Sequence, residues 1–225
     1  MMNLLVAGAG KGIGKATADF AYQRGHKVIA VSRTETDLKG RPYKTLTLDL
    51  EKPESIALLG SYSSSMEAII NCTGTHPGGQ EVNESWEYRV RNIIDQNVRP
   101  ALHLYRAFLP AFRERKKGHF VHVSSAALDF FDESESGYCA SKAALEAVVL
   151  SLQNGDKRTQ VLHHAVRVSL TDTPLTRKVC PNITDWDKFY KGEEIALYLI
   201  DIVENPDNYP KTIVTPLYKP VRKIE

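Results

Sequence analysis

The strongest constraint on the fold is a short apolar segment that runs directly into closely spaced glycines. Leu4 to Ala7 has the composition of a buried β-strand, and glycines follow at positions 8, 10, 12 and 14. Apolar residues then recur at helical spacing from Ile13 to Ala21, and Gly25 is placed to end that helix. Such a turn leaves free backbone N–H groups at a helix N-terminus, where a phosphate group binds favourably.

Further apolar runs follow at intervals that suit the strands of a parallel sheet. They are Val28 to Val31, Lys44 to Leu48, Ala68 to Cys72, His119 to Val123, Val161 to Ser169 and Thr212 to Val214. Helical spacing of apolar residues marks Ile94 to Phe112, Tyr138 to Leu152 and Glu193 to Val203. This alternation predicts a doubly wound, mostly parallel sheet with helices on both faces. With no linker or repeat in sight, we expect one α/β, Rossmann-like domain over residues 1–225.

Charge and cysteine content argue against several classes of protein. The formal net charge is only +2, so nothing in the composition favours binding to nucleic acid or an anionic membrane surface. Cys72, Cys139 and Cys180 are odd in number and form no CxxC pair, which predicts reduced thiols in a cytoplasmic protein and no zinc site. No apolar run reaches membrane-spanning length, so we expect no membrane span. The spacing of the cysteines gives no reason to expect a metal.

The glycine loop has to be assigned to one of several phosphate-binding patterns. A nucleoside triphosphate loop ending at its Gly-Lys pair would have Ala9 in place of the first glycine and Ala16 in place of the magnesium-binding hydroxyl. The GxGxxG dinucleotide turn also fails, because Ile13 occupies its third glycine. The spacing GxxxGxG does fit, and it lets the backbone approach a pyrophosphate. Its members are Gly8, Gly12 and Gly14. A glycine-rich turn without a ligand is the alternative.

Other motifs follow the glycine loop along the chain. They are Asn71-Cys72-Thr73-Gly74, Asn97, the Ser124-Ser125 pair, and Tyr138 with Lys142. In this order and spacing the chain resembles the short-chain dehydrogenase/reductase family over nearly its whole length. The resemblance implies a nicotinamide-dependent oxidoreductase that acts on a small carbonyl or alcohol substrate and assembles as a homodimer or homotetramer. Its paired helices would be those near Arg99–Phe112 and Tyr138–Leu152.

The resemblance implies a catalytic set made of Asn97, Ser125, Tyr138 and Lys142. Tyr138 and Lys142 are four residues apart on a predicted helix, so their side chains share one face. A phenol titrates at about pH 10, and a nearby ammonium lowers its pKa. We therefore expect Tyr138 to donate a proton to the carbonyl near neutral pH, while hydride comes from the cofactor. An ordinary pair of surface side chains is the alternative.

Ser125 and Asn97 complete the set through their positions in the resembled family. Ser125 matches the family's substrate-orienting serine better than Ser124, although a shift of one residue in the loop would exchange the two roles. Asn97 lies three residues before Pro100, which is expected to bend the helix. In the resembled family such an asparagine holds a water that relays protons to the lysine. An asparagine on the helix surface is the alternative reading.

The residues after the second predicted strand favour one cofactor over the other. An NAD-binding chain carries Asp or Glu there, whereas Ser32 and Arg33 follow Val31, and Lys11 lies in the glycine loop. Two cations and a hydroxyl suit a 2′-phosphate, so we expect NADP(H) to be preferred over NAD(H), although Glu35 is close by. Other expected cofactor contacts are Gly8, Gly10, Gly12, Ile13, Gly14, Asp49, Leu50, Asn71, Gly74, Tyr138, Lys142, Thr171 and Thr173.

The chain departs from the family pattern near its C-terminal third. Val168-Ser169 stands where Pro-Gly is usual, so a catalytically weak NADP(H)-binding sensor is the alternative function. A nucleotide-sugar epimerase would need more residues after Lys142 and ranks last. The segment from Arg177 to Gly192 is short, which predicts a small lid. The acidic loop before Tyr138 would disfavour anionic substrates, or is simply solvated; its acids are Asp129, Asp132, Glu133 and Glu135.

Overall fold

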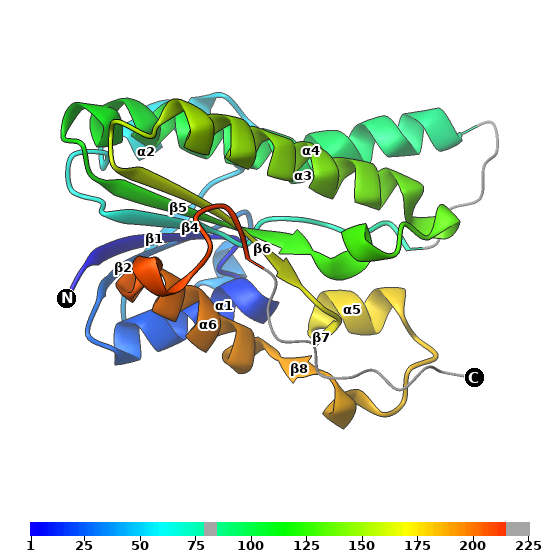
Figure 1. Ribbon diagram of the computed structural model, residues 1–225. Helices are drawn as coiled ribbons and strands as arrows, with labels where there is room; N and C mark the ends of the chain where they lie inside the picture. The colour runs from blue at the N-terminus through cyan, green and yellow to red at the C-terminus, as the bar shows by residue number, and fades with distance from the viewer. Residues whose placement is uncertain (79–84, 215–225) are drawn as a thin grey trace.

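A parallel β-sheet forms the centre of the computed structural model, which describes residues 1–78 and 85–214 (Figure 1). Its seven strands have the order β3-β2-β1-β4-β5-β6-β9, and every neighbouring pair is parallel. The strands are β1 Asn3–Ala7, β2 Lys27–Ser32, β3 Lys44–Thr47, β4 Ala68–Asn71, β5 Gly118–Ser125, β6 Val161–Val168 and β9 Ile213–Val214. The predicted doubly wound parallel sheet is confirmed.

Helices cover both faces of this sheet, as the two layers of Figure 1 show. On one face lie α1 (Gly12–Gln23) and α6 (Gly192–Glu204), and on the other lie α2 (Glu54–Gly60), α3 (Trp86–Glu114) and α4 (Ser136–Gly155). The alternating side chains of β1 explain the two cores, since Leu4 packs with the first layer and Leu5 with the second. Among the described helices, none is both long enough and apolar enough to cross a membrane.

The order in which strands are added to the sheet reverses between β1 and β4. From β1 the sheet grows through β2 and β3 toward one edge, and from β4 it grows through β5, β6 and β9 toward the other. In open α/β sheets a ligand binds outside the carboxyl ends of the strands at such a point. The glycine loop after β1, the segment after β4 and Ser125 at the end of β5 all lie at this edge. Beyond it lie α5 (Pro174–Val179) and the small sheet of β7 (Thr171–Asp172) and β8 (Tyr190–Lys191), at the lower right of Figure 1.

The long helix differs from the prediction in its extent. Apolar spacing marked Ile94 to Phe112, whereas α3 runs from Trp86 to Glu114 and continues through both Pro100 and Pro110. Trp86, Val90 and Ile93 continue the helical spacing of apolar residues before Ile94, so the sequence pattern itself extends further than the predicted range.

Candidate active site

The glycine loop packs tightly on the segment that follows β4. Gly8 has a φ of +76°, and a Cβ there would lie 2.8 Å from the carbonyl carbon of Cys72. A Cβ on Gly14 would collide with the Gly8 carbonyl oxygen. The first turn of α1 has no acidic residue and no side-chain cap, so its backbone N–H groups are suited to an anion. The residues of this loop therefore fit a dinucleotide pyrophosphate.

The cations expected to recognise a 2′-phosphate lie at the surface beside this loop. Arg33 pairs with Glu51 at 2.9 Å and its side chain is 64% exposed, while Lys11 pairs with Asp37 at 3.4 Å and is 67% exposed. Exposed pairs of this kind contribute little, so either cation can exchange its partner for a phosphate at small cost. Ser32 faces the loop, since a Cβ on Gly10 would lie 2.6 Å from its Oγ.

Asp37 is a residue of this region that the sequence analysis did not single out. A Cβ on Gly10 would lie 3.1 Å from Asp37 Oδ2, whereas the acid considered from sequence was Glu35. Asp37 ends a single 3-10 turn, η1 (Glu35–Asp37), that folds the carboxylate back over the loop. A short turn leaves no periodic signal in the sequence. The cofactor's adenosine end would therefore meet one carboxylate as well as the two cations.

Asp49 and Leu50 hold the turn after β3. Asp49 Oδ1 accepts from the backbone N–H of Glu51 at 3.0 Å, and the Asp49 carbonyl accepts from Ser55 Oγ at 2.5 Å. The buried Leu50 accepts at its carbonyl from His103 Nδ1 at 2.8 Å. These bonds fix the backbone at the edge of the crevice.

Asn71 and Gly74 have different roles after β4. Asn71 is buried, accepts at Oδ1 from the backbone N–H of Thr73 at 3.0 Å, and shares a 3.0 Å hydrogen bond with His122 of β5. Its side chain thus ties strands together. Gly74 lets the chain pass close to two catalytic candidates, because a Cβ there would lie 3.3 Å from Lys142 Nζ and 3.4 Å from Asn97 Oδ1.

Asn97 is fully buried on α3 and is not a surface asparagine. Its Oδ1 accepts from the backbone N–H of Thr75 at 2.7 Å, and its Nδ2 donates to the Thr75 carbonyl at 3.0 Å and to Ser141 Oγ at 2.9 Å. These bonds join α3, α4 and the segment after β4. Asn97 therefore fixes the backbone next to Lys142, and its role in holding a water stays a prediction.

Lys142 is buried and points at the carboxyl end of β5. Its Nζ donates to the Val123 carbonyl at 3.0 Å and lies 5.7 Å from the centroid of the Tyr138 ring. Burial lowers the pKa of Lys142 to about 8, and the nearby Cys72 and Glu146 act in the opposite direction.

The Tyr138 phenol does not have the lowered pKa that its spacing from Lys142 predicted. Burial raises the pKa of Tyr138 to about 12, a hydrogen bond with Ser125 lowers it, and Glu135 and Cys139 raise it further. The expectation of an acidified phenol was wrong for the free chain, because removal from water raises the pKa of Tyr138 by more than the hydrogen bond with Ser125 lowers it. The phenol therefore stays protonated through the neutral range.

The two neighbouring serines face opposite directions. Ser125 bonds to Tyr138 and accepts at Oγ from the backbone N–H of Ala127 at 3.1 Å. Ser124 donates to Glu146 Oε1 at 2.7 Å inside the protein. Of the pair, only Ser125 is thus brought to the phenol.

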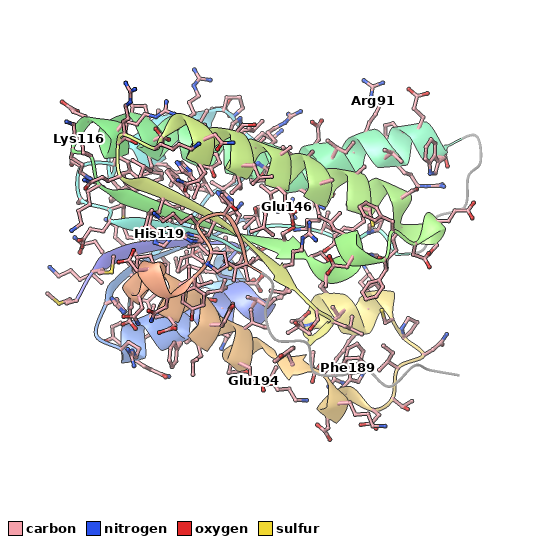
Figure 2. All side chains as sticks on the ribbon, in the orientation of Figure 1. Arg91, Lys116, His119, Glu146, Phe189 and Glu194 are labelled. Carbon is pink, nitrogen blue, oxygen red and sulfur yellow. The ribbon has the colours of Figure 1, made fainter. Side chains whose placement is uncertain are left out.

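A partly buried ion pair that the sequence did not reveal supports this arrangement. Arg167 of β6 donates to both oxygens of Glu146 at 2.9 and 2.7 Å and to Asp129 at 2.5 Å. Figure 2 shows Glu146 between α4 and the sheet. Because Glu146 follows Lys142 by one helical turn, its position on the buried face of α4 was the available signal.

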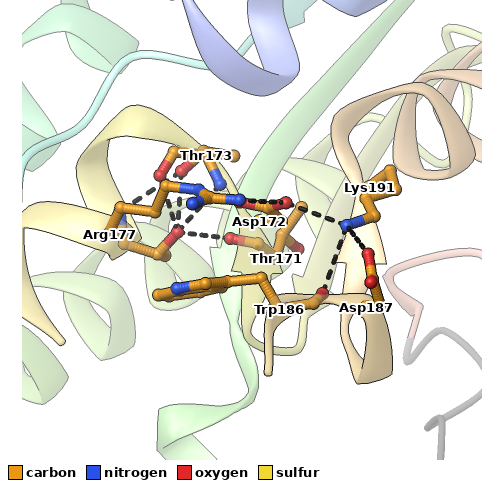
Figure 3. Close-up of polar contacts among 8 residues, drawn as sticks. Thr171, Asp172, Thr173, Arg177, Trp186, Asp187 and Lys191 are labelled. Carbon is orange, nitrogen blue, oxygen red and sulfur yellow. Dashed lines mark hydrogen bonds and ion pairs between the residues drawn. The ribbon is translucent and has the colours of Figure 1, made fainter. Parts of the chain in front are cut away.

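Acidic and basic side chains clasp the segment after β6 into a compact unit, drawn in Figure 3. Asp172 accepts from Arg177 Nε at 2.5 Å and from Lys191 Nζ at 2.9 Å. Thr173 caps α5, and its Cβ lies 3.4 Å from the position a Cβ would take on Gly12. Thr171 donates to the Ser169 carbonyl at 2.8 Å. The clasp keeps Thr173 beside the glycine loop.

The departure from Pro-Gly has a simple structural consequence. Val168 is the last residue of β6, and it pairs with Ser125 of β5. Regular strand therefore extends to the level of Ser125 before the chain turns at Ser169.

Comparisons with known proteins agree with this geometry. A family model described as short chain dehydrogenase matches residues 2–183. An uncharacterized oxidoreductase of Staphylococcus epidermidis is 26% identical over 186 residues, which is 76% of this chain and 79% of that protein.

Two solved structures illustrate the shared fold. A closed serine dehydrogenase complexed with NADP+ has a TM-score of 0.84, 21% identity and full coverage of both chains (100% of each). A 3-ketoacyl-(acyl-carrier-protein) reductase of Brucella melitensis complexed with NADH has a TM-score of 0.82 and 18% identity, and the match covers 95% of this chain and 96% of that one.

Proposed function

Because the chain belongs to the short-chain dehydrogenase family and is an NAD(P)-dependent oxidoreductase, we propose that it uses NADPH to reduce an aldehyde or ketone to an alcohol, with Tyr138 as the proton donor. What supports the proposal most directly is the convergence of four side chains from three elements, α3, β5 and α4, at one edge of the sheet. They are Asn97, Ser125, Tyr138 and Lys142.

Each of these groups has a distinct task in the proposed reaction. When bound, the reduced cofactor supplies the hydride. Ser125 donates a hydrogen bond to the substrate carbonyl and orients it toward the phenol. Tyr138 donates its proton to the developing alkoxide, and Lys142 stabilises the phenolate that remains. Asn97 holds the backbone of Thr75 and keeps Lys142 in reach of a proton path to solvent.

The raised pKa of the phenol supports the reductive direction. A phenol whose pKa is about 12 is fully protonated at neutral pH and is ready to donate. Alcohol oxidation would need the phenolate instead, and burial makes that form costly in the free chain.

The preference for NADPH rests on Arg33, Lys11 and Ser32. Arg33 and Lys11 are themselves exposed and each pairs with a partly exposed carboxylate, so a 2′-phosphate can replace Glu51 or Asp37 as their partner. Asp37 is the one described acid against Gly10, and it opposes the preference. Among related folds, one is seen with NADP+ and another with NADH, so the fold itself does not decide.

A catalytically weak NADP(H)-binding sensor is the second candidate function. It is favoured by Val168-Ser169, where β6 continues as regular strand to Val168 and Pro-Gly is usual in the resembled family. A sensor would bind the cofactor without oxidising it on any carbonyl compound.

The conversion Tyr138→Phe tests the proposal, because it removes the proton and retains the ring. In a fluorescence titration, we expect the Tyr138→Phe chain to bind NADPH with the same dissociation constant as the unmodified chain. Its turnover on a panel of aldehydes and ketones should fall at least about 100-fold. Retained turnover would remove Tyr138 as the acid. Equal affinity for NADPH and NADH would refute the cofactor preference, and binding without turnover by the unmodified chain would favour the sensor.

A further inference from the structure

The imidazole of His76 lies against the phenol of Tyr138. The two ring centroids are 4.2 Å apart, with the planes tilted by 50°. His76 comes after β4 and Tyr138 lies in the first turn of α4, and the His76 side chain is only 12% exposed. A buried ring at this distance restricts how the phenol can turn. The phenol is thus held from one side by a residue outside the proposed catalytic set.

Two hydrogen bonds define the state of the His76 ring. Nδ1 accepts from the backbone N–H of Gly78 at 3.1 Å, and Nε2 lies 3.2 Å from Glu135 Oε1. A nitrogen that accepts carries no proton, so the proton is on Nε2 and is donated to Glu135. This geometry directs the Nε2–H of His76 at the Glu135 carboxylate.

Glu135 contacts His76 and lies close enough to Tyr138 for its charge to help raise the pKa of the phenol. It ends the 3-10 turn η3 (Glu133–Glu135), and its side chain is one third exposed (33%). Burial is the largest cause of the raised pKa of Cys139 and of Cys180, the residue that follows α5. The negative charge of Glu135 is the next cause for both thiols. Among the residues that the structure describes, the titratable or charged groups around the phenol are His76, Glu135, Cys139 and Lys142.

We propose that His76 and Glu135 form a positioning pair for the Tyr138 phenol, and that the Glu135 carboxylate makes the site select carbonyl compounds without negative charge. This inference rests on the proposed function. An anionic substrate whose carbonyl reaches Tyr138 has to approach Glu135, and the like charges repel in a partly buried site. A neutral or cationic compound with a hydroxyl or amine donor gains a hydrogen bond to the same carboxylate.

Removing the charge of Glu135 has a second, independent consequence. The carboxylate opposes ionisation of the phenol, so Glu135→Gln should lower the pKa of Tyr138 while retaining an oxygen that accepts from His76. The limb of the pH profile that reports loss of the protonated donor then moves to lower pH. A side chain that only holds the loop in place would not move that limb.

The experiment compares two aldehydes of the same shape, para-formylbenzoate and para-formylbenzamide, with NADPH. The unmodified chain should favour the uncharged amide in kcat/KM by roughly tenfold or more, the scale of one like-charge contact in a partly buried site. Glu135→Gln should reduce that ratio several-fold. Glu133→Gln is the matched control, since it removes a charge from the same turn at an exposed position, and it should retain the ratio. A ratio unchanged by Glu135→Gln would overturn the selection.

A readout without turnover separates this inference from the proposed function. The ultraviolet absorbance of tyrosinate, taken as the difference between each chain and its Tyr138→Phe counterpart, titrates Tyr138 alone. We expect a lower pKa in the Glu135→Gln chain than in the Glu133→Gln chain. If neither aldehyde is reduced by the unmodified chain, the proposed function fails for these substrates, while an unchanged pKa in the titration would overturn the positioning pair.

His76 is tested by two substitutions of different shape. His76→Phe keeps a ring against the phenol and loses the bond to Glu135, whereas His76→Ala loses both. If the ring positions the phenol, kcat should fall further in His76→Ala than in His76→Phe, with the NADPH dissociation constant unchanged in each. Equal loss in the two variants would contradict a role for the ring contact.

Discussion

Lys142 is a buried lysine whose charge the protein interior disfavours. The pKa of Lys142 in the folded chain is lowered to about 8, whereas a lysine in the unfolded chain has a pKa of about 10.4. Below pH 8 (roughly) the side chain is charged in both states, so the folded chain carries the full cost of burying the ammonium. Between the two pKa values the unfolded chain binds more protons, and stability rises with pH. The lysine is thus retained at a cost in stability, as groups at functional sites often are.

Lys142→Met should therefore stabilise the free chain while abolishing turnover. Relief of the buried charge outweighs the lost bond to the Val123 carbonyl, so the free energy of unfolding at pH 7 should rise by about 2 kcal/mol. Urea unfolding at pH 7 and pH 10 checks this, because the gain should shrink at the higher pH. A gain of equal size at both pH values would mean that packing, not charge, is responsible.

The residues of the site differ in how far the sequence could identify them. Tyr138 and Lys142 are one helical turn apart, so helix periodicity alone brings them together. The sequence favoured Ser125 but could not settle its choice over Ser124, because neighbouring strand residues point to opposite faces and the register was unknown. The structure separates the two, since Ser124 donates to Glu146 inside the protein. His76 and Glu135 are separated by 59 positions, so only the tertiary fold joins them.

At the scale of elements, the segment from β7 to β8 is held by ion pairs as well as by the buried rings of Trp186 and Phe189. Asp172 binds both Arg177 and Lys191, and these bonds lower the pKa of Asp172 to about 2. A carboxyl with a depressed folded pKa contributes stability above its unfolded pKa and loses that stability as the pH falls toward the folded value. The clasp should therefore be intact at neutral pH and weaken only in strong acid.

Asp172→Asn should loosen this segment at neutral pH without unfolding the sheet. Loss of the charge releases Arg177 and Lys191 together, so backbone amides of residues 171–191 should exchange with deuterium several-fold faster, and the substrate KM should rise. Asp187→Asn is the matched control, because Asp187 is 96% exposed and binds Lys191 alone at 3.1 Å. Equal exchange rates in the two variants would show that the clasp does not hold the segment.

The elements that the sequence identified are those with enough residues to display a period. β5 is buried along its whole length, and α4 has 20 residues, enough to display helical spacing even though Lys142 and Glu146 lie on its buried face. α2 has seven residues and β7 and β8 have two each, which is too short for any periodicity. The small sheet forms because Thr171 and Tyr190 are brought together by the fold, and no local preference predicts it.

At the scale of the whole molecule, α3 and α4 form an outer layer that is not covered by any other described element. A groove between them is lined mainly by apolar side chains: Leu102, Tyr105, Ala147, Val148, Ser151 and Leu152. Leu102 is 45% exposed there. Members of this family are typically oligomeric, and we infer that a second copy of the chain covers this face, since an apolar groove gains by burial against its own symmetric counterpart.

Leu102→Glu should therefore dissociate the assembly. A charge near the two-fold axis of an isologous interface faces the same charge on the other copy, so the substitution places two like charges opposite each other in an apolar contact. Light scattering should give a dimer or tetramer for the unmodified chain and a smaller species for Leu102→Glu. Leu197→Glu is the control, since Leu197 is also exposed, at 55%, but lies on α6 on the opposite face of the sheet. Dissociation by Leu197→Glu with none by Leu102→Glu would move the interface to the α6 face.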